Sequence, residues 1–197
     1  FSGILNCTNQ GIVDLTGIEE FTSLVNLNCS NNALTTLDIS SNTNLQYFSC
    51  IFNSLTSLTL GNNTSLVSVN FSWNNISSID LSGLPALEGL TCQDNNLSSL
   101  DISNNLSITT LSCNINAITF LDISAHSSLT HLSAGGNQLI SLNAANGNNS
   151  NFSFFGAQNN PNLTCVQVDD LSYSNTNWSS NIDTTASFSL SCPQCIV

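Results

Sequence analysis

Apolar and polar positions alternate along this chain in a pattern that returns about every 21 residues. The stretch 24–40 reads L-x-x-L-x-C-x-x-N-x-L-x-x-L-D-I-S, and most of the chain before residue 164 is a variant of it. In each copy, apolar side chains at alternate positions would point to the same side of an extended segment. The pattern predicts two short strands per copy, and it leaves little room for a helix between them.

Two columns fix the register of the repeats. The inward position after the second leucine recurs in steps of 22, five times 21, and 23 residues, and three positions later an asparagine recurs. A slip of one residue would destroy both columns, so the copies are genuine structural repeats. The inward column contains Cys7, Cys29, Cys50, Phe71, Cys92, Cys113, Ala134 and Ala157. The asparagine column contains Asn32, Asn53, Asn74, Asn95, Asn116, Asn137 and Asn160.

The motif L-x-x-L-x-C-x-x-N-x-L, followed by L-x-x-L-D-I-S-x-N, resembles the leucine-rich repeat over residues 4 to 163. The 21-residue length is similar to the short, nested class found mainly in bacteria. The resemblance implies a mainly β solenoid, with parallel strands on the concave side, an extended or strand-like convex side, little helix, and caps at both ends. It also implies that the asparagine column points inward and satisfies backbone groups of adjacent coils.

The repeats divide the chain into an N-terminal capping coil at 1–22, leucine-rich repeats at 23–163 and a C-terminal cap at 164–197. We expect a short turn or helical piece at Gly17–Phe21 and a looser loop at Asn143–Asn151. The tail resembles the C-terminal cap of leucine-rich repeat proteins secreted by Bacteroidetes-type bacteria, through Asn-Pro-Asn-Leu-Thr-Cys at 160–165 and Asn-Trp at 177–178. With this resemblance we expect Cys165 to bond Cys192, and type IX secretion is the implied route.

Charge sets this chain apart from ordinary soluble domains, of which roughly 25% of residues are charged. Only 6% are charged here, with twelve Asp and Glu, no Lys and no Arg, and a net charge of -12. Nothing can neutralise phosphates, so nucleic acid is excluded as a partner, and anionic membranes are disfavoured. No run of 18 apolar residues predicts membrane insertion. Because the chain begins at Phe1, we interpret it as a mature or excised piece of a larger chain or assembly.

The inward cysteines are expected to be buried free thiols, because Phe71 and Ala134 take the same position and show that it needs only an apolar filler. Disulfides between neighbouring coils are not excluded by distance, although parallel side chains in register suit the bond poorly. The cysteines lack metal-ligand spacing and a histidine partner, so no cofactor is expected. Cys192 and Cys195 form a C-x-x-C pair, but no helix follows them as a redox motif requires.

An outward column of the second strand carries Asp38, Asp80, Asp101 and Asp122. Three consecutive carboxylates, Asp80, Asp101 and Asp122, would stack about 4.8 Å apart with no cation between them. Repulsion should raise their pKa values or recruit a cation, which makes them weak metal candidates. The alternative is that each carboxylate accepts hydrogen bonds from backbone N–H groups of its own turn.

No catalytic set stands out. The two histidines lie in one coil, His126 in the convex-side turn and His131 at an outward concave position, and both are expected to be solvated. Serine is abundant but no G-x-S-x-G motif occurs, so an enzyme is not predicted.

The concave face is the usual ligand surface of this fold, and its outward side chains are small, uncharged and polar with a few rings. The candidate ligand-binding residues are Asn26, Asn28, Tyr47, Ser68, Asn70, Thr91, Thr110, His131 and Phe154. We therefore predict a non-catalytic extracellular or cell-surface recognition or adhesion module that binds a protein or glycan. One alternative is a purely structural spacer or stalk. Another is ice binding through a flat Ser/Thr/Asn face, although no regular Thr-x-Thr row is present.

Overall fold

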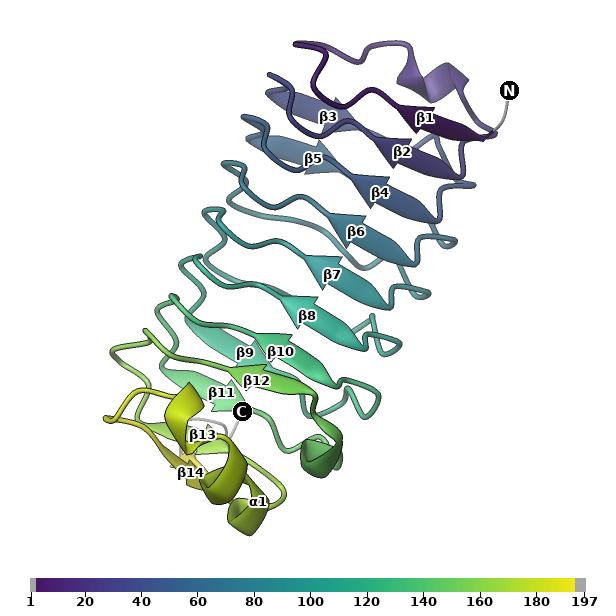
Figure 1. Ribbon diagram of the computed structural model, residues 1–197. Helices are drawn as coiled ribbons and strands as arrows, with labels where there is room; N and C mark the ends of the chain where they lie inside the picture. Colours follow the sequence, from purple (N-terminus) through teal and green to yellow (C-terminus); the bar gives the residue numbers. More distant parts are fainter. Residues whose placement is uncertain (1–2, 194–197) are drawn as a thin grey trace.

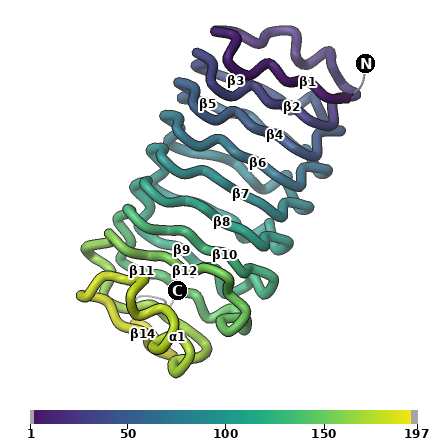
Figure 2. Tube along the Cα trace, in the orientation of Figure 1, coloured from purple at the N-terminus to yellow at the C-terminus, as the bar shows by residue number. Residues whose placement is uncertain are grey.

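The computed structural model describes residues 3–193, and in it the chain is an elongated stack of similar coils (Figures 1 and 2). Each regular coil crosses the concave side as a three-residue strand and returns along the convex side. The mainly β leucine-rich repeat solenoid predicted from the sequence is therefore confirmed. The only α-helix in the described part is α1 (Leu171–Asn177), and no helix there is long and apolar enough to cross a membrane.

Eight parallel strands form the concave sheet within residues 3–193, each paired in register with the equivalent strand of the next coil. They are β1 (Ile4–Asn6), β2 (Asn26–Asn28), β4 (Tyr47–Ser49), β6 (Ser68–Asn70), β7 (Gly89–Thr91), β8 (Thr110–Ser112), β10 (His131–Ser133) and β12 (Phe154–Gly156). Because His131 pairs with Phe154, Ala157 follows Ala134 in the inward column, as the repeat spacing predicted.

The convex side is strand-like in two stretches. β3 (Thr36–Asp38) pairs with β5 (Ser57–Thr59), and a second sheet runs in the order β14 (Ser187–Ser189), β13 (Cys165–Gln167), β11 (Ser141–Asn143) and β9 (Phe120–Asp122). The two intervening coils, which contain Ile79 and Leu100, form no convex strand. The mixture of strand and extended chain agrees with the expected convex side.

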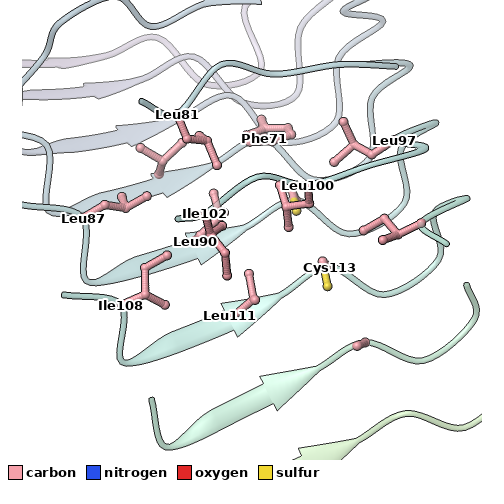
Figure 3. Packing of buried hydrophobic residues seen from close by; sticks show 14 of the residues in the cluster. Phe71, Leu81, Leu87, Leu90, Leu97, Leu100, Ile102, Ile108, Leu111 and Cys113 are labelled. Atoms are coloured by element: carbon pink, nitrogen blue, oxygen red, sulfur yellow. The ribbon is translucent and has the colours of Figure 1, made fainter. Parts of the chain in front are cut away.

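The core lies between these two sides and is made almost entirely of the repeated apolar positions. Figure 3 shows Leu90 and Leu111 from successive concave strands beside Leu87 and Ile108, with Cys113 among the core side chains. Cys29, Cys50, Cys92 and Cys113 are fully buried, and Phe71 fills the same column where a larger side chain fits. Each coil buries its apolar face only against its neighbours, so the stack is stable as a whole and not coil by coil.

The asparagine column points inward, as predicted. Asn74 is representative: its amide nitrogen donates to the carbonyl oxygens of Cys50 (3.0 Å) and Phe71 (2.9 Å), and its side-chain oxygen accepts from the Leu55 N–H (3.0 Å). The side chain therefore satisfies backbone groups of two coils at the bend that follows each concave strand.

A second inward polar column lies at the opposite turn, where only His126 was considered from the sequence and was expected to be solvated. Asn42, Asn63 and Asn105 are fully buried there, and His126 occupies the next coil with 1% of its surface exposed. The expectation of a solvated His126 was wrong, because it follows Asn105 by one repeat length and takes its inward position. One ring nitrogen of His126 lies 3.2 Å from the Ile102 carbonyl oxygen, the same kind of contact that Asn105 makes with Leu81.

The ends carry most of the irregular structure. The helical piece expected near Gly17 is the 3-10 turn η1 (Ile18–Glu20), and η2 (Asn149–Asn151) lies in the predicted loop. That loop is packed against the coil more closely than expected, because Asn149 is buried and its amide donates to the Ala144 carbonyl (2.8 Å).

The C-terminal segment covers the last coil with β13, α1, η3 (Ser179–Asn181) and β14. The predicted Cys165–Cys192 disulfide is present. Trp178 stacks on Phe155 at 4.2 Å between ring centroids, and Asp183 accepts from the backbone N–H groups of Asn159 (2.9 Å) and Asn160 (2.6 Å). Cys195 lies outside the described residues.

Candidate binding face

The concave sheet places the predicted ligand-binding residues in two outward columns. Asn26, Tyr47, Ser68, Thr110, His131 and Phe154 occupy the first position of their strands, and Asn28, Asn70 and Thr91 occupy the third. The middle residue of each of these strands is buried, so the flanking side chains point away from the core. This geometry follows from strand alternation and regular parallel pairing.

Rings lie toward both ends of the first column, and small residues lie between them. Tyr47 is 47% exposed and Phe154 43% exposed, and His131 stacks on Phe154 with the ring centroids 5.0 Å apart. Between the two ends the column holds Ser68, Gly89 and Thr110. A flat centre flanked by rings can contact a broad, weakly polar surface, while the rings supply apolar anchors.

The second column supplies hydrogen-bonding groups. The side-chain oxygens of Asn28 and Asn70 accept from the backbone N–H groups of Ser30 and Ser72, both at 3.1 Å, which fixes the two amides in place. Because these hydrogen bonds hold the two side chains in place, their amide nitrogens are oriented as hydrogen-bond donors. Arg and Lys are absent from the whole chain, so the hydrogen-bonding groups of this face are amides, hydroxyls and the His131 ring.

For the aspartate column of the convex side, one prediction concerned the pKa values of the stacked carboxylates. The pKa of Asp80 is lowered by hydrogen bonds from the Ser82 side chain and backbone, and that of Asp101 by the corresponding groups of Ser103, although repulsion from Asp80 acts in the opposite direction. For Asp80 and Asp101 the expected rise was wrong, because these local hydrogen bonds outweigh repulsion between solvated carboxylates. Asp122 accepts from the Ser124 N–H in the same way (2.8 Å). The turn-capping alternative is confirmed, and residues 3–193 hold no cluster of three or more His, Cys, Asp or Glu fit for a metal.

The inward thiols are chemically protected. Cys7, Cys29, Cys50, Cys92 and Cys113 are free. Burial raises the pKa of Cys29 and of Cys113 to about 12, and it raises those of Cys50 and Cys92 well above the usual value. Since the thiolate is the reactive form, these side chains act as core fillers at neutral pH.

A third outward feature was missed from the sequence. Immediately before each inward asparagine, the backbone takes a left-handed conformation. Five successive residues at this position form what we call the left-handed column: Asn31, Phe52, Trp73, Asp94 and Ile115. Gly136 and Asn159 hold the same position in the next two coils. Phe52 and Trp73 stack at 4.5 Å with 12° between ring planes. The signal was the replacement of Asn, Asp or Gly by bulky residues at this repeat position.

Comparisons with known proteins agree with this architecture. No family model matches the chain. A 39-residue stretch, 20% of this chain and 4% of its match, is 54% identical to Internalin J of Listeria monocytogenes serotype 4b. The solved functional domain of InlJ from Listeria monocytogenes, described as including a cysteine ladder, is 30% identical with a TM-score of 0.64. That match covers 84% of this chain and 44% of the InlJ chain.

The solved internalin InlF of Listeria monocytogenes is 24% identical with a TM-score of 0.63, over 92% of this chain and 52% of that one. This chain therefore spans about half or less of the proteins that it matches. The coil geometry and these matches together identify its fold as the leucine-rich repeat solenoid seen in internalin structures.

Proposed function

We propose that this chain is a non-catalytic recognition module that binds a protein or glycan through its concave face at the cell surface or outside the cell. The observation that supports it best is the outward column with Tyr47 toward one end and the stacked His131–Phe154 pair toward the other. Exposed rings on a rigid sheet bind partners at low entropic cost, because the sheet is already ordered before binding. The likeness to internalins favours a protein partner, and type IX secretion remains part of this proposal.

Binding to protein and glycan arrays tests the proposal. We expect the purified chain to bind a defined subset of spots and the variant Tyr47→Ala/His131→Ala/Phe154→Ser to lose about tenfold or more in affinity, as hot-spot residues do. Phe120→Ser, which removes a ring that is 57% exposed on the convex side, is the matched control.

Unchanged binding in the triple variant would contradict the concave-face proposal. Failure of the wild type to bind any array would favour the spacer alternative. Thermal hysteresis at millimolar concentration would instead support ice binding.

A further inference from the structure

The left-handed column is a continuous structural row and not a set of scattered outliers. Its five members have φ values between 53° and 55°. The Trp73 N–H donates to the Gln93 carbonyl (2.9 Å), and the Asn74 N–H donates to the Asp94 carbonyl (3.1 Å). These bonds join successive coils at this bend, so residues of the column are neighbours along the solenoid.

Three residues of the column are poorly suited to their backbone. Asn, Asp and Gly tolerate the left-handed region, whereas bulky and β-branched residues there are genuine outliers. Burial does not compensate for this at Phe52, which is 49% exposed, or at Ile115, which is 52% exposed, whereas Trp73 is half-buried. Stacking on Trp73 offers a structural reason for Phe52, but Ile115 has no ring partner. Strained residues that contribute little to the core are typical of binding sites.

Asp94 lies in the column between Trp73 and Ile115, and its carboxylate differs from those of the convex-side aspartates. The carboxylates of Asp38, Asp80, Asp101 and Asp122 each accept a backbone N–H from their own turn. Within residues 3–193, no backbone or side-chain donor forms a hydrogen bond to the Asp94 carboxylate, and the chain contains no Lys or Arg to pair with it. Phe52 of the preceding coil stacks on one face of the Trp73 indole. The opposite face is directed toward the following coil, which contains Asp94.

We propose that the left-handed column binds an arginine side chain of a basic protein partner. The guanidinium would stack on the free face of Trp73 and pair with the Asp94 carboxylate, while Ile115 contacts the aliphatic part of the side chain. Charge complementarity points to this occupant, because the chain has a net charge of -12 and no Lys or Arg. A second copy of this chain has no arginine to place there. This site is separate from the concave face and does not depend on the function proposed for it.

Tryptophan fluorescence offers a direct test, because Trp178 is buried in the C-terminal cap and Trp73 is the more accessible of the two indoles. The probe is an N-acetylated tetra-arginine amide, compared with the same peptide made of citrulline or lysine. We expect the arginine peptide to change the Trp73 emission, the lysine peptide to bind more weakly and the citrulline peptide not to bind. Asp94→Asn should weaken arginine binding by about fivefold or more, the range expected for a cation–π contact joined to an ion pair.

Asp38→Asn is the matched control, because it removes the same charge from the convex side. If it weakens binding as much as Asp94→Asn does, the attraction is diffuse and the site is refuted. Equal binding of the citrulline peptide would also refute it.

We expect Trp73→Asn to abolish binding of the arginine peptide. Its melting temperature, measured by calorimetry, should not fall, since asparagine suits the left-handed backbone. A marked drop in melting temperature would show that the column is structural and overturn the proposal. Tyr47→Ala/His131→Ala should leave arginine binding unchanged, so the two proposals can fail independently.

Discussion

At the residue scale, the inward asparagine of each coil forms hydrogen bonds to backbone groups that the bend buries. The bend after each concave strand takes backbone groups away from water, and an unpaired buried backbone group costs about 1–3 kcal/mol. The Asn74 amide meets three such carbonyls, of Cys50, Phe71 and Ser72, and one N–H, of Leu55. An alanine could occupy the same space but could satisfy none of them.

Asn74→Ala should therefore lower the free energy of unfolding by about 3 kcal/mol or more, because it leaves several buried groups unpaired. Urea denaturation followed by circular dichroism measures this. Asn75→Ala, a change at the adjacent exposed residue, should stay within about 0.5 kcal/mol of the wild type. Equal effects of the two changes would mean that water replaces the Asn74 amide.

At the element scale, no single strand is stable alone, because each is only three residues long and gains its partners from adjacent coils. The last coil therefore needs a cover that the repeat itself does not supply. The C-terminal cap covers it with Trp178 and Phe188 against Phe155, two hydrogen bonds to Asp183, and a disulfide.

Loss of the Cys165–Cys192 bond should loosen this cap before the repeats unfold. The bond closes a loop with a sequence separation of 27. Restricting the unfolded chain by such a loop stabilises the folded state by about 3.5 kcal/mol. In a Trp73→Phe background, Trp178 is the only indole and reports on the cap. Cys165→Ser should move its fluorescence transition to lower urea than the circular dichroism transition. Coincident transitions in this variant would show that cap and repeats unfold together.

At the scale of the whole molecule, the buried thiols link folding to pH. Cys29, Cys50, Cys92 and Cys113 have raised pKa values in the folded chain, about 12 for Cys29 and Cys113. In the unfolded chain the same groups ionise near pH 8.5. The thiols therefore contribute to the free energy of unfolding as long as they are protonated in both states. This contribution is complete below about pH 8.5 and is lost as pH rises toward about 12.

Stability should accordingly fall above pH 9, by about 1.4 kcal/mol per pH unit for each thiol that ionises only on unfolding. Chemical denaturation at pH 7 to 10.5 under reducing conditions measures the slope. Replacing the four cysteines with alanine, the residue already present at positions 134 and 157 of this column, should flatten it. An equally steep slope in the alanine variant would assign the pH dependence to other groups.

The sequence by itself determined the repeat, its register and the sides that its columns face. Leucine, cysteine and asparagine spacing set which side chains point inward, and strand alternation then placed Tyr47, His131 and Phe154 on the concave face. The Cys165–Cys192 bond was also predicted, from the resemblance of the tail to known caps. Apart from this disulfide, these features follow from periodicity, so spacing along the sequence is enough to predict them.

Only the tertiary structure decided how residues one coil apart affect each other. It made His126 a core residue because a neighbouring coil supplies a carbonyl for its ring. It lowered the pKa of Asp101 because local hydrogen bonds outweigh repulsion from Asp80 of the preceding coil. It also aligned Phe52, Trp73, Asp94 and Ile115 on left-handed backbone, which no hydrophobic pattern reveals. These outcomes depend on backbone angles and on distances between coils, and spacing along the chain encodes neither.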